Sequence, residues 1–467
     1  SIDNAAIARN FVAQGMDIRY PRVDWAGPEG YVETELPLQM FGVAWLYQVA
    51  GREIPWLGRL VTVFISVAML AAFFRLARAL AGQRAALAAL LLLAFSPTSL
   101  YFSRTFQQDA LMLLTQMLAL YHAFRWLERP DERPADAAIV AAMLALGALI
   151  KPTALLIGIP IAVMVLQREG LRALRRPALY LVGFGALLPP IGWYLHARNM
   201  YLMHGFTFGI VSGGHDKFQW QRFLLQPHWY HEMLTRLVTW HLTPAGLLLT
   251  LGGALVLWRR ALPHRPVILA WTLTMVAFIP LVAEANLDMV YYQWVALPPL
   301  ALLAGLAVDA AWSSAKARAV VASLLLLVVP ASYVILRPCY DVHQTAQLEL
   351  ARAIDQLVPP GALLLDAGAY DVHNPGGYNF EPHHFYYSGH KGWVLVEEAF
   401  SIPEVERHRA MGATHLVSRM TGMLRQHPGF LEQIHARYQV LREEEGILVV
   451  ALSPMNPAPS AAYAPDR

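Results

Sequence analysis

Charged residues are scarce in this chain of 467 residues. Lys, Arg, Asp and Glu make up 15% of it, whereas 56% of the residues are hydrophobic and the mean hydropathy is +0.39. Typical soluble proteins carry about 25% charged residues. Because so few charges cannot cover the surface of a soluble protein of this length, the composition excludes a soluble globular enzyme and a disordered chain. The net charge of +3 gives no indication of nucleic-acid binding.

Cysteine and the common cofactor motifs are also missing or nearly so. The single cysteine, Cys339, permits no intramolecular disulfide and no thiolate metal cluster. The sequence contains no P-loop, no dinucleotide-binding fingerprint and no HExxH pair, and His228 with His231 is a weak metal signal. We therefore expect neither a nucleotide-driven reaction nor a dedicated metal site, and a divalent cation is the one cofactor left open.

Long apolar runs dominate the first 340 residues. A helix needs roughly 20 apolar residues to cross a bilayer, and backbone groups in lipid must bond within their own helix. Ten runs are predicted to span a membrane: 55–74, 85–102, 109–127, 136–150, 152–167, 178–196, 242–258, 266–284, 292–311 and 318–337. A further apolar segment, 36–50, is predicted to be interfacial or half-inserted.

Basic residues in the short loops predict the orientation of these spans. Alternate loops are rich in arginine or lysine, and we expect them to be cytoplasmic: those around residues 75–84, 129–133, 168–176, 259–265 and 316–318. The segment before residue 55, the connection 197–241 and the chain after 337 then lie on the outer face. This predicts a multi-pass protein of the bacterial inner membrane with its active site on the periplasmic side.

The character of the sequence changes after residue 337, where charges and turn residues return. Short apolar runs there predict strands, and stretches with helical spacing lie between them. The predicted fold is an all-α polytopic membrane protein with a small C-terminal α/β extracytoplasmic domain. Its four parts are a first outer loop with amphipathic and juxtamembrane helices (1–54), the transmembrane domain (55–337), the α/β domain (338–455) and a flexible tail (456–467). The α/β domain is expected either to bind acceptor or glycan through its aromatic stretch, 376–393, or to pack on the outer loops.

Charged and aromatic residues at the predicted outer ends of the helices are the candidates for chemistry, since charges there are costly and usually functional. They are Asp3, Arg9, Glu33, Glu35, Arg104, Asp109, Lys151, Tyr291 and Tyr292. Each has a structural alternative: a capping aspartate, a snorkelling cation, or a member of the aromatic belt. Lys151 is the only charge between Asp136 and Arg168, and an ammonium suits a lipid phosphate as a point charge.

An ordered set of segments carries a resemblance to a known superfamily. The segments are DNAAIARNF, YPRVDW, GYVETELPL, LGRLV, SRTFQQDALML, LIKPT and YYQWVALPPLALLAG, from residue 3 to about residue 305. In this order they resemble bacterial GT-C glycosyltransferases of the family 39-like, protein-mannosyltransferase and lipid A aminoarabinose-transferase type. The resemblance covers residues 1 to about 340, and the order of the motifs is its specific feature.

The resemblance implies an enzyme that takes a sugar from a polyprenyl-phosphate carrier on the outer face of the membrane. The acceptor would be a hydroxyl or phosphate of a lipid, glycan or protein, and no nucleic acid takes part. Asp3 matches the acidic residue that acts as general base in the family. A transmembrane helix normally precedes this residue, so we expect the chain to lack its first one. Two departures are that Asn4 follows Asp3 where relatives often have Glu, and that Met289 and Val290 stand where relatives often carry His.

Displacing a phosphate from an anomeric carbon needs a base for the incoming hydroxyl and positive charge for the leaving group. We predict Asp3 as the catalytic base. Lys151, Arg104, Tyr291 and Tyr292 are the predicted contacts of the donor phosphate, and Asp109, Glu33, Glu35 and Arg9 are supporting residues. Asp109 is expected to orient Arg104 by a charge-assisted hydrogen bond.

Three alternative functions fit parts of the same pattern. A transporter or flippase for a lipid-linked or small substrate would also have many helices, although we find no internal repeat of the kind transporters use. A polysaccharide polymerase or ligase shares the carrier chemistry. A catalytically inactive scaffold is consistent with the departures at Asn4 and Met289.

Overall fold

The computed structural model describes residues 2–130, 132–211, 223–340, 345–369, 382–419, 424–444 and 446–454. The chain divides into two compact units. The helical unit comprises residues 35–199 and 216–342, and the mixed unit comprises residues 2–34, 200–215 and 343–467. The predicted tail, 456–467, and the start of the aromatic stretch, 376–381, lie outside the described residues.

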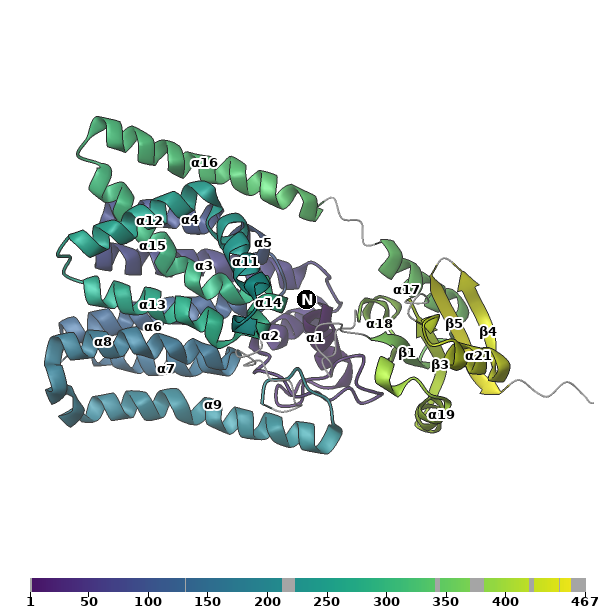
Figure 1. Cartoon of the computed structure of the whole chain (residues 1–467). Helices are drawn as coiled ribbons and strands as arrows, with labels where there is room; N and C mark the ends of the chain where they lie inside the picture. The colour runs from purple at the N-terminus through teal and green to yellow at the C-terminus, as the bar shows by residue number, and fades with distance from the viewer. Residues whose placement is uncertain are drawn as a thin grey trace, which may run out of the picture. The chain divides into compact units, whose positions relative to one another are not determined.

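Helices of very different length form the helical unit (Figure 1). They are α2 (Leu38–Ala50), α3 (Leu57–Ala81), α4 (Gln83–Phe95), α5 (Pro97–Phe102), α6 (Asp109–Glu128), α7 (Pro134–Ile150), η1 (Pro152–Ile157), α8 (Gly158–Glu169), η2 (Gly170–Arg175), α9 (Pro177–His204, whose last turn belongs to the mixed unit), α11 (Pro227–Arg236), η3 (Leu237–His241), α12 (Thr243–Arg259), α13 (Arg265–Leu281), α14 (Ala283–Asp288), η4 (Val290–Ala296), α15 (Leu297–Ala311) and α16 (Ala315–Tyr340).

Five stretches in the described part of the chain are long and apolar enough to cross a membrane. They are Leu57–Ala81, Pro152–Arg175, Pro177–His204, Val290–Ala311 and Ala315–Tyr340. A bent pair, Pro227–His241 with Thr243–Arg259, passes the same test together with a 100° angle between its halves. The chain is therefore a multi-pass membrane protein, and the predicted fold class, a helical membrane domain with a small C-terminal sheet, is confirmed.

Breaks in the helices distinguish the structure from the predicted spans. The run 85–102 divides at Ser96, whose hydroxyl accepts a hydrogen bond from the Ser99 backbone N–H and caps α5. Pro97 at the first position of α5 suits such a start, since its missing N–H would have no partner there. The run 292–311 begins as the 3-10 helix η4 before α15 continues it. Composition alone does not show such breaks, because both sides of each one are apolar.

Small residues let the central helices of this unit approach closely. Helix α15 packs on both α12 and α4, and α6 packs on α3 and α7. A Cβ atom added at Gly253 would lie 1.7 Å from the Leu303 carbonyl oxygen, and one at Gly305 would lie 2.2 Å from that of Ala85. Close backbone contact through glycine is typical of helices packed in lipid, where dispersion contacts replace the hydrophobic effect.

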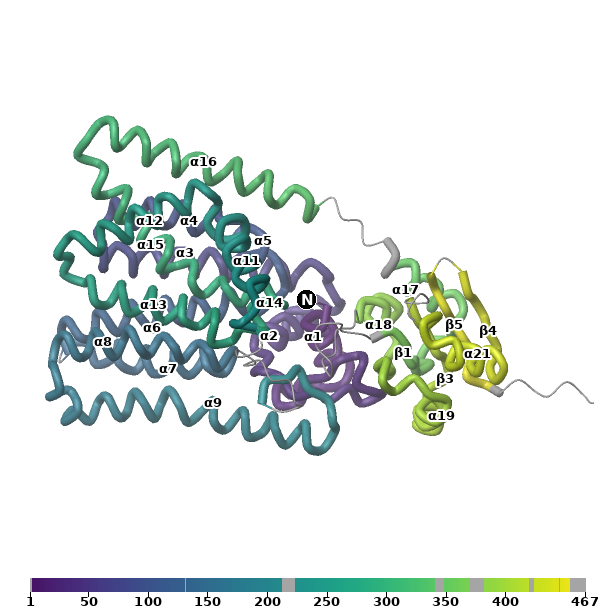
Figure 2. Tube along the Cα trace, viewed as in Figure 1, coloured from purple at the N-terminus to yellow at the C-terminus, as the bar shows by residue number. Residues whose placement is uncertain are grey.

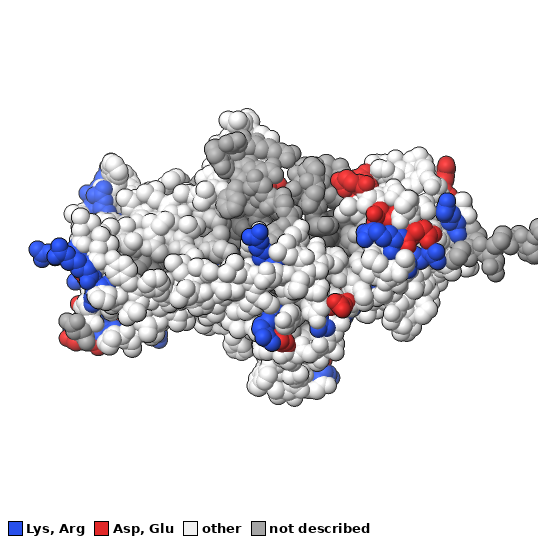
Figure 3. Space-filling model, turned by 90° about the horizontal axis from the view of Figure 1, so that it is seen from below, with Lys and Arg blue, Asp and Glu red and all other residues white. Residues whose placement is uncertain are grey.

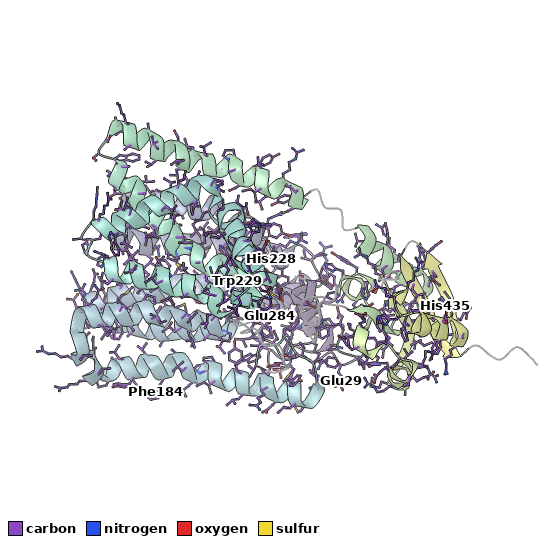
Figure 4. The ribbon with its side chains drawn as sticks, in the orientation of Figure 1. Glu29, Phe184, His228, Trp229, Glu284 and His435 are labelled. Carbon is purple, nitrogen blue, oxygen red and sulfur yellow. The ribbon has the colours of Figure 1, made fainter. Side chains whose placement is uncertain are left out.

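The outward sides of the helices are apolar. Figure 3 shows the helical unit with little charge along its length and a group of Lys and Arg side chains at one end. Helix α9 is the most exposed of these apolar helices, since only 11% of its most apolar 18-residue stretch is buried. Its Phe184, labelled in Figure 4, is 60% exposed. An exposed apolar surface of this extent suits lipid chains.

Helices α11 and α14 are joined by hydrogen bonds near the break before α12. The indole N–H of Trp229 donates to the Ala283 carbonyl oxygen over 3.0 Å, and Arg236 donates to the carbonyl oxygens of Asn286 and Leu287. Figure 4 shows Trp229 beside Glu284 of α14. These bonds hold α14 directly before η4, the element that carries Tyr291 and Tyr292.

The mixed unit contains a five-stranded sheet of order β2-β1-β3-β5-β4. Its elements are α1 (Ile2–Gln14), α17 (Thr345–Leu357), β1 (Leu363–Ala369), α18 (His383–Ser388), β2 (Lys391–Val396), η5 (Glu397–Ala399), α19 (Ile402–Ala410), β3 (Ala413–Ser418), α21 (Pro428–Arg437), β4 (Tyr438–Glu444) and β5 (Ile447–Pro454). Strands β2, β1 and β3 run parallel, and β5 pairs antiparallel with β3 and β4. Figure 2 shows the N-terminal helix α1 beside α18, with which it is in contact.

Candidate active site

A buried ion pair joins α6 and α7 in the helical unit. The Lys151 Nζ donates to the Asp109 Oδ1 over 2.5 Å, and both side chains are largely buried. Asp109 is the first residue of α6, where the helix dipole favours a carboxylate, and Lys151 follows the last residue of α7, where it favours a cation. Helix polarity therefore stabilises both charges at the positions they occupy.

Two tyrosines cover the amine of Lys151. Its Nζ lies 4.7 Å from the ring centroids of both Tyr291 and Tyr292, which belong to η4. Tyr292 stacks on Phe278, and Tyr291 meets the edge of Phe102. An ammonium held against aromatic faces keeps favourable electrostatics at low hydration cost. The structure thus brings together Lys151, Asp109 and both tyrosines, all of which were predicted as site residues.

Glu35 belongs to the same cluster. Its carboxylate acts electrostatically on Lys151 and on the tyrosine pair. The adjacent Leu36 donates its backbone N–H to the Leu149 carbonyl oxygen over 2.9 Å, and the Tyr194 hydroxyl donates to the Ala148 carbonyl oxygen over 2.8 Å. These bonds occupy carbonyl groups at the end of α7 and attach the segment that follows Glu35 to the residues just before Lys151.

Arg104 takes a different position from the one expected. Its guanidinium lies 4.2 Å from the Tyr340 ring and 5.8 Å from the Tyr101 ring, and the side chain is exposed. Asp109 pairs with Lys151, whereas the expected partner was Arg104. The reason is the local fold: Asp109 enters α6 and turns inward, while Arg104 lies in the preceding turn and faces outward.

A polar network holds η4 in place. The His241 Nε2 is 2.7 Å from the Gln293 Oε1, and the His241 Nδ1 is 2.8 Å from the Thr98 hydroxyl. The Trp294 indole N–H donates to the Ser99 hydroxyl over 3.1 Å. All of these groups are buried, so they fix the rotation of the turn that presents Tyr291 and Tyr292. Sequence reasoning missed this network, since no charge marks it.

Asp3 lies in the first turn of α1, in the mixed unit, and is partly buried. The Trp25 indole N–H donates to its Oδ1 over 3.0 Å. Burial raises the pKa of Asp3 to about 6; the Trp25 hydrogen bond opposes this rise and the field of Asp24 adds to it. The carboxylate is therefore a stronger base than an ordinary aspartate while it stays mostly ionised at pH 7.

Glu33 is fully buried and hydrogen-bonded on both carboxylate oxygens. Its Oε1 accepts from the Val211 backbone N–H over 3.1 Å, and its Oε2 accepts from the Thr207 hydroxyl. The Glu33 backbone also exchanges hydrogen bonds with Phe206 and Phe208. Through these hydrogen bonds Glu33 holds residues 206–211 in place. Of the two glutamates predicted as supporting residues, Glu35 is the one whose charge acts on Lys151.

Arg9 contacts two parts of the mixed unit. It donates to the Asp24 Oδ2 over 2.7 Å and to the Tyr386 carbonyl oxygen over 2.8 Å, and its guanidinium lies 4.5 Å from the Tyr386 ring. The Asp24 Oδ1 also accepts from the Asn10 amide over 2.9 Å. Asp24 and Trp25, which sequence reasoning missed, thus connect most of the contacts around Asp3. The only signal for them is the YPRVDW motif in which they stand.

In the described part of the chain, no group of three or more His, Cys, Asp or Glu side chains is placed to hold a metal ion.

Two kinds of comparison relate the chain to known proteins. Residues 37–194 match the family model described as dolichyl-phosphate-mannose-protein mannosyltransferase. No curated protein sequence matches the chain. The matched region contains Asp109, Lys151 and Arg104 but ends before the two tyrosines.

Solved structures give a broader match. ArnT from Cupriavidus metallidurans, bound to undecaprenyl phosphate, is similar with a TM-score of 0.64 and 16% identity, over 97% of this chain and 93% of that one. An Archaeoglobus fulgidus oligosaccharyltransferase tethered to an acceptor peptide gives a TM-score of 0.61 and 12% identity, over 96% of this chain and 69% of that one. Arabinofuranosyltransferase AftD from Mycobacteria gives 0.52 and 16%, over 90% and 34%.

These structural neighbours are GT-C glycosyltransferases, and the chain has the GT-C fold. The resemblance identified from the ordered sequence motifs is therefore confirmed.

Proposed function

We propose that this protein transfers a sugar from a polyprenyl-phosphate carrier to a hydroxyl or phosphate of a lipid, glycan or protein acceptor. The proposed location is the periplasmic side of the bacterial inner membrane. Asp3 is the general base, and Lys151 with Tyr291 and Tyr292 holds the donor phosphate. The ArnT neighbour bound to undecaprenyl phosphate supports the donor class, and the acceptor peptide in the oligosaccharyltransferase neighbour supports a separate acceptor.

The observation that carries this proposal is the environment of Lys151. A buried amine is costly unless something anionic shares its site. Asp109 accepts one of its three N–H bonds and the tyrosine rings cover other sides. The remaining donor capacity and the two phenols form a compact group suited to phosphate oxygens. Lys151 therefore does more than keep a turn hydrated.

The proposed reaction is a single in-line displacement. The acceptor O–H gives its proton to Asp3 as the oxygen attacks the anomeric carbon. The bond from that carbon to the phosphate oxygen breaks, and its electron pair leaves on the polyprenyl phosphate. Lys151 offsets the negative charge that develops on this leaving group. Attack opposite the phosphate inverts the anomeric centre.

The test is sugar transfer by the purified protein. It is incubated with radiolabelled polyprenyl-phosphate sugars and a membrane extract, and the labelled product is identified. We expect label on an acceptor and, in Lys151→Gln, a KM for the lipid donor raised at least about tenfold, since one charge-assisted bond to phosphate is lost. Lys316→Gln, at an exposed lysine of α16, is the matched control.

Two results would contradict the proposal. Movement of intact labelled lipid across a vesicle membrane without a labelled product would favour the transporter alternative. An unchanged donor KM in Lys151→Gln would remove Lys151 from the phosphate site.

The side of the membrane is tested separately by cysteine labelling. In a Cys339→Ser background, a cysteine replaces either Leu225 or Leu171, which are 85% and 76% exposed. We expect an impermeant maleimide added to spheroplasts to label the Leu225→Cys protein and not the Leu171→Cys protein. The reverse pattern would place the proposed active side in the cytoplasm.

A further inference from the structure

The N-terminal segment is attached to the free edge of the C-terminal sheet in the mixed unit. Strand β2 is an edge strand. Its Gly392 donates its backbone N–H to the Asp24 carbonyl oxygen over 2.9 Å and accepts from the Gly27 N–H over 2.7 Å. Ala26 and Trp393 form an antiparallel bridge. Residues 24–27 thus pair with β2 as a short extra strand, a geometry that aligns backbone groups with high register specificity.

The turn at Gly27 is shaped for this contact. Gly27 has a φ of +76°, and a Cβ atom added there would lie 2.9 Å from the Trp393 Nε1. Any other residue would therefore meet both backbone strain and the Trp393 indole. Gly15 provides a comparison in the same N-terminal segment, since it has a φ of +113° but nothing within 4 Å of an added Cβ.

The residues in this added strand hold helix α1. Asp24 is 2% exposed and accepts from both Arg9 and Asn10, which stand one after the other on α1. Arg9 continues to the Tyr386 carbonyl oxygen on α18. The C-terminal domain therefore fixes α1 from two directions, through β2 with Asp24 and through α18 with Arg9.

Trp25 connects the strand that pairs with β2 to Asp3. Its indole N–H donates to the Asp3 Oδ1, and Trp25 as a whole is 4% exposed. Phe206 and Phe208 meet this ring edge-on, with centroids 6.2 Å and 5.7 Å away. Burial and these two ring contacts restrict the orientation of the indole, and so fix the direction of its N–H bond. Trp25 stands between Asp24 and Ala26, both of which contact β2.

We propose that the C-terminal α/β domain is a positioning device for the catalytic carboxylate: the edge of β2 sets residues 24–27, and Trp25 orients Asp3. This rests on the proposed function, in which Asp3 is the base. Trp25 is a positioning residue, since it acts through its hydrogen bond to Asp3. The domain then packs on the N-terminal loop and thereby supports the chemistry, which is the packing role of the two expected for it.

The first variant is Trp25→Phe, which keeps an aromatic ring and removes the N–H donor. We expect kcat to fall about tenfold, because a misaligned base loses most of its advantage, while the KM for the lipid donor stays unchanged. The acid limb of the pH–kcat profile should move up by about 0.5–1 pH unit, since the lost bond stabilised the ionised carboxylate. Asp24 is the charged side chain whose field reaches Asp3 in the described residues, and it is unchanged in this variant.

Trp229→Phe is the matched control. It also removes one buried indole N–H bond, to the Ala283 carbonyl oxygen in the helical unit. We expect its pH profile to be that of the wild type. A shift of equal size in both variants would mean a general loss of stability and would overturn the assignment of Trp25.

The second variant tests the sheet edge without touching Trp25. Gly27→Ala should raise hydrogen exchange in residues 24–27 and in α1, and should lower kcat at unchanged donor KM. Gly15→Ala carries comparable backbone strain and should leave exchange at residues 24–27 as in the wild type. This pair gives a readout even where Trp25→Phe fails to fold.

The outcomes separate this inference from the proposed function. Absence of transfer by the wild type from every polyprenyl-phosphate sugar would refute the function itself. Transfer by the wild type, with kcat and acid limb unchanged in Trp25→Phe and Gly27→Ala, would refute the positioning role and leave the function intact.

Discussion

The Lys151 amine donates a hydrogen bond to the Asp109 Oδ1 over 2.5 Å, and this bond connects the end of α7 to the beginning of α6. Forty-two residues separate the two in sequence. The pair stabilises the helical unit and, in the proposed reaction, also takes part in binding the donor phosphate. Its contribution to the free energy of unfolding can be measured separately from its effect on sugar transfer.

Removing one partner of this pair should destabilise the helical unit strongly. Asp109→Asn leaves a buried ammonium without its counter-charge, which typically costs about 3–5 kcal/mol. The double variant Asp109→Asn with Lys151→Met should lose less than the sum of the single variants, since no unpaired charge remains. Thermal unfolding in detergent, followed by tryptophan fluorescence, measures these differences.

The exposed pair Arg84–Asp309 is the control for that experiment. Its side chains are 53% and 40% exposed, so Asp309→Asn should change stability by less than about 1 kcal/mol. Equal losses at Asp109 and Asp309 would show that the buried pair contributes no more than a surface one.

Asp3 should set the acid limb of the pH–rate profile. Burial raises its pKa to about 6, and a general base must be ionised, so activity should fall as pH drops through about 6. Asp3→Asn should lose about two to four orders of magnitude in kcat, the usual contribution of a general base. Steady-state kinetics between pH 4.5 and about 8.5 measures both effects. An acid limb near the ordinary aspartate value, or full activity in Asp3→Asn, would reject the assignment.

Part of this picture could be predicted from the sequence. Apolar runs of membrane length and the ordered motifs led to the GT-C fold, because both signals are local. Lys151 was recognised as a site residue since no other charge stands near it. Its partner was not: Arg104 is close to Asp109 in sequence, and nothing local shows that the loop after α7 returns to α6.

The support around Asp3 could not be predicted for a related reason. Trp25 carries no charge, and its indole bond to Asp3 spans 22 residues. The pairing of residues 24–27 with β2 spans most of the chain. Alternating patterns indicate a strand and leave its neighbours undetermined, so the order of the sheet and the strand added at its edge come only from the fold.

Lys391, the first residue of β2, should lower the stability of the mixed unit at neutral pH. Burial, together with the nearby Arg22 and Arg9, lowers its pKa to about 8 from 10.5, although Asp24 acts in the opposite direction. The folded state therefore binds fewer protons than the unfolded state between these values, so stability decreases as pH falls from 10.5 to 8 and stays low below that. Lys391→Met removes the charge and should stabilise by about 1–3 kcal/mol at pH 7, after allowance for partial solvation.

Chemical denaturation at pH 7 and near pH 10 measures this effect. The gain from Lys391→Met should shrink at the higher pH, where the wild-type amine is neutral in the folded state. Lys316→Met, at an exposed lysine, should show no gain at either pH. A gain that is independent of pH would assign the effect to packing, and a loss of stability would reject the prediction.

Glu33 and Glu35 should respond differently to the same substitution. Both oxygens of Glu33 accept hydrogen bonds, from Val211 and Thr207, so Glu33→Gln leaves one of these donors poorly paired and should cost about 1–3 kcal/mol. The segment it fastens packs on Trp25, so kcat should fall along with stability. Glu35→Gln acts instead on the field at Lys151. Removing that negative charge should lower the KM for the anionic lipid donor by a few-fold and leave stability nearly unchanged. Unfolding curves and donor titrations on the two variants test these assignments. A changed donor KM in Glu33→Gln alone would assign the effect on the donor site to Glu33 and not to Glu35.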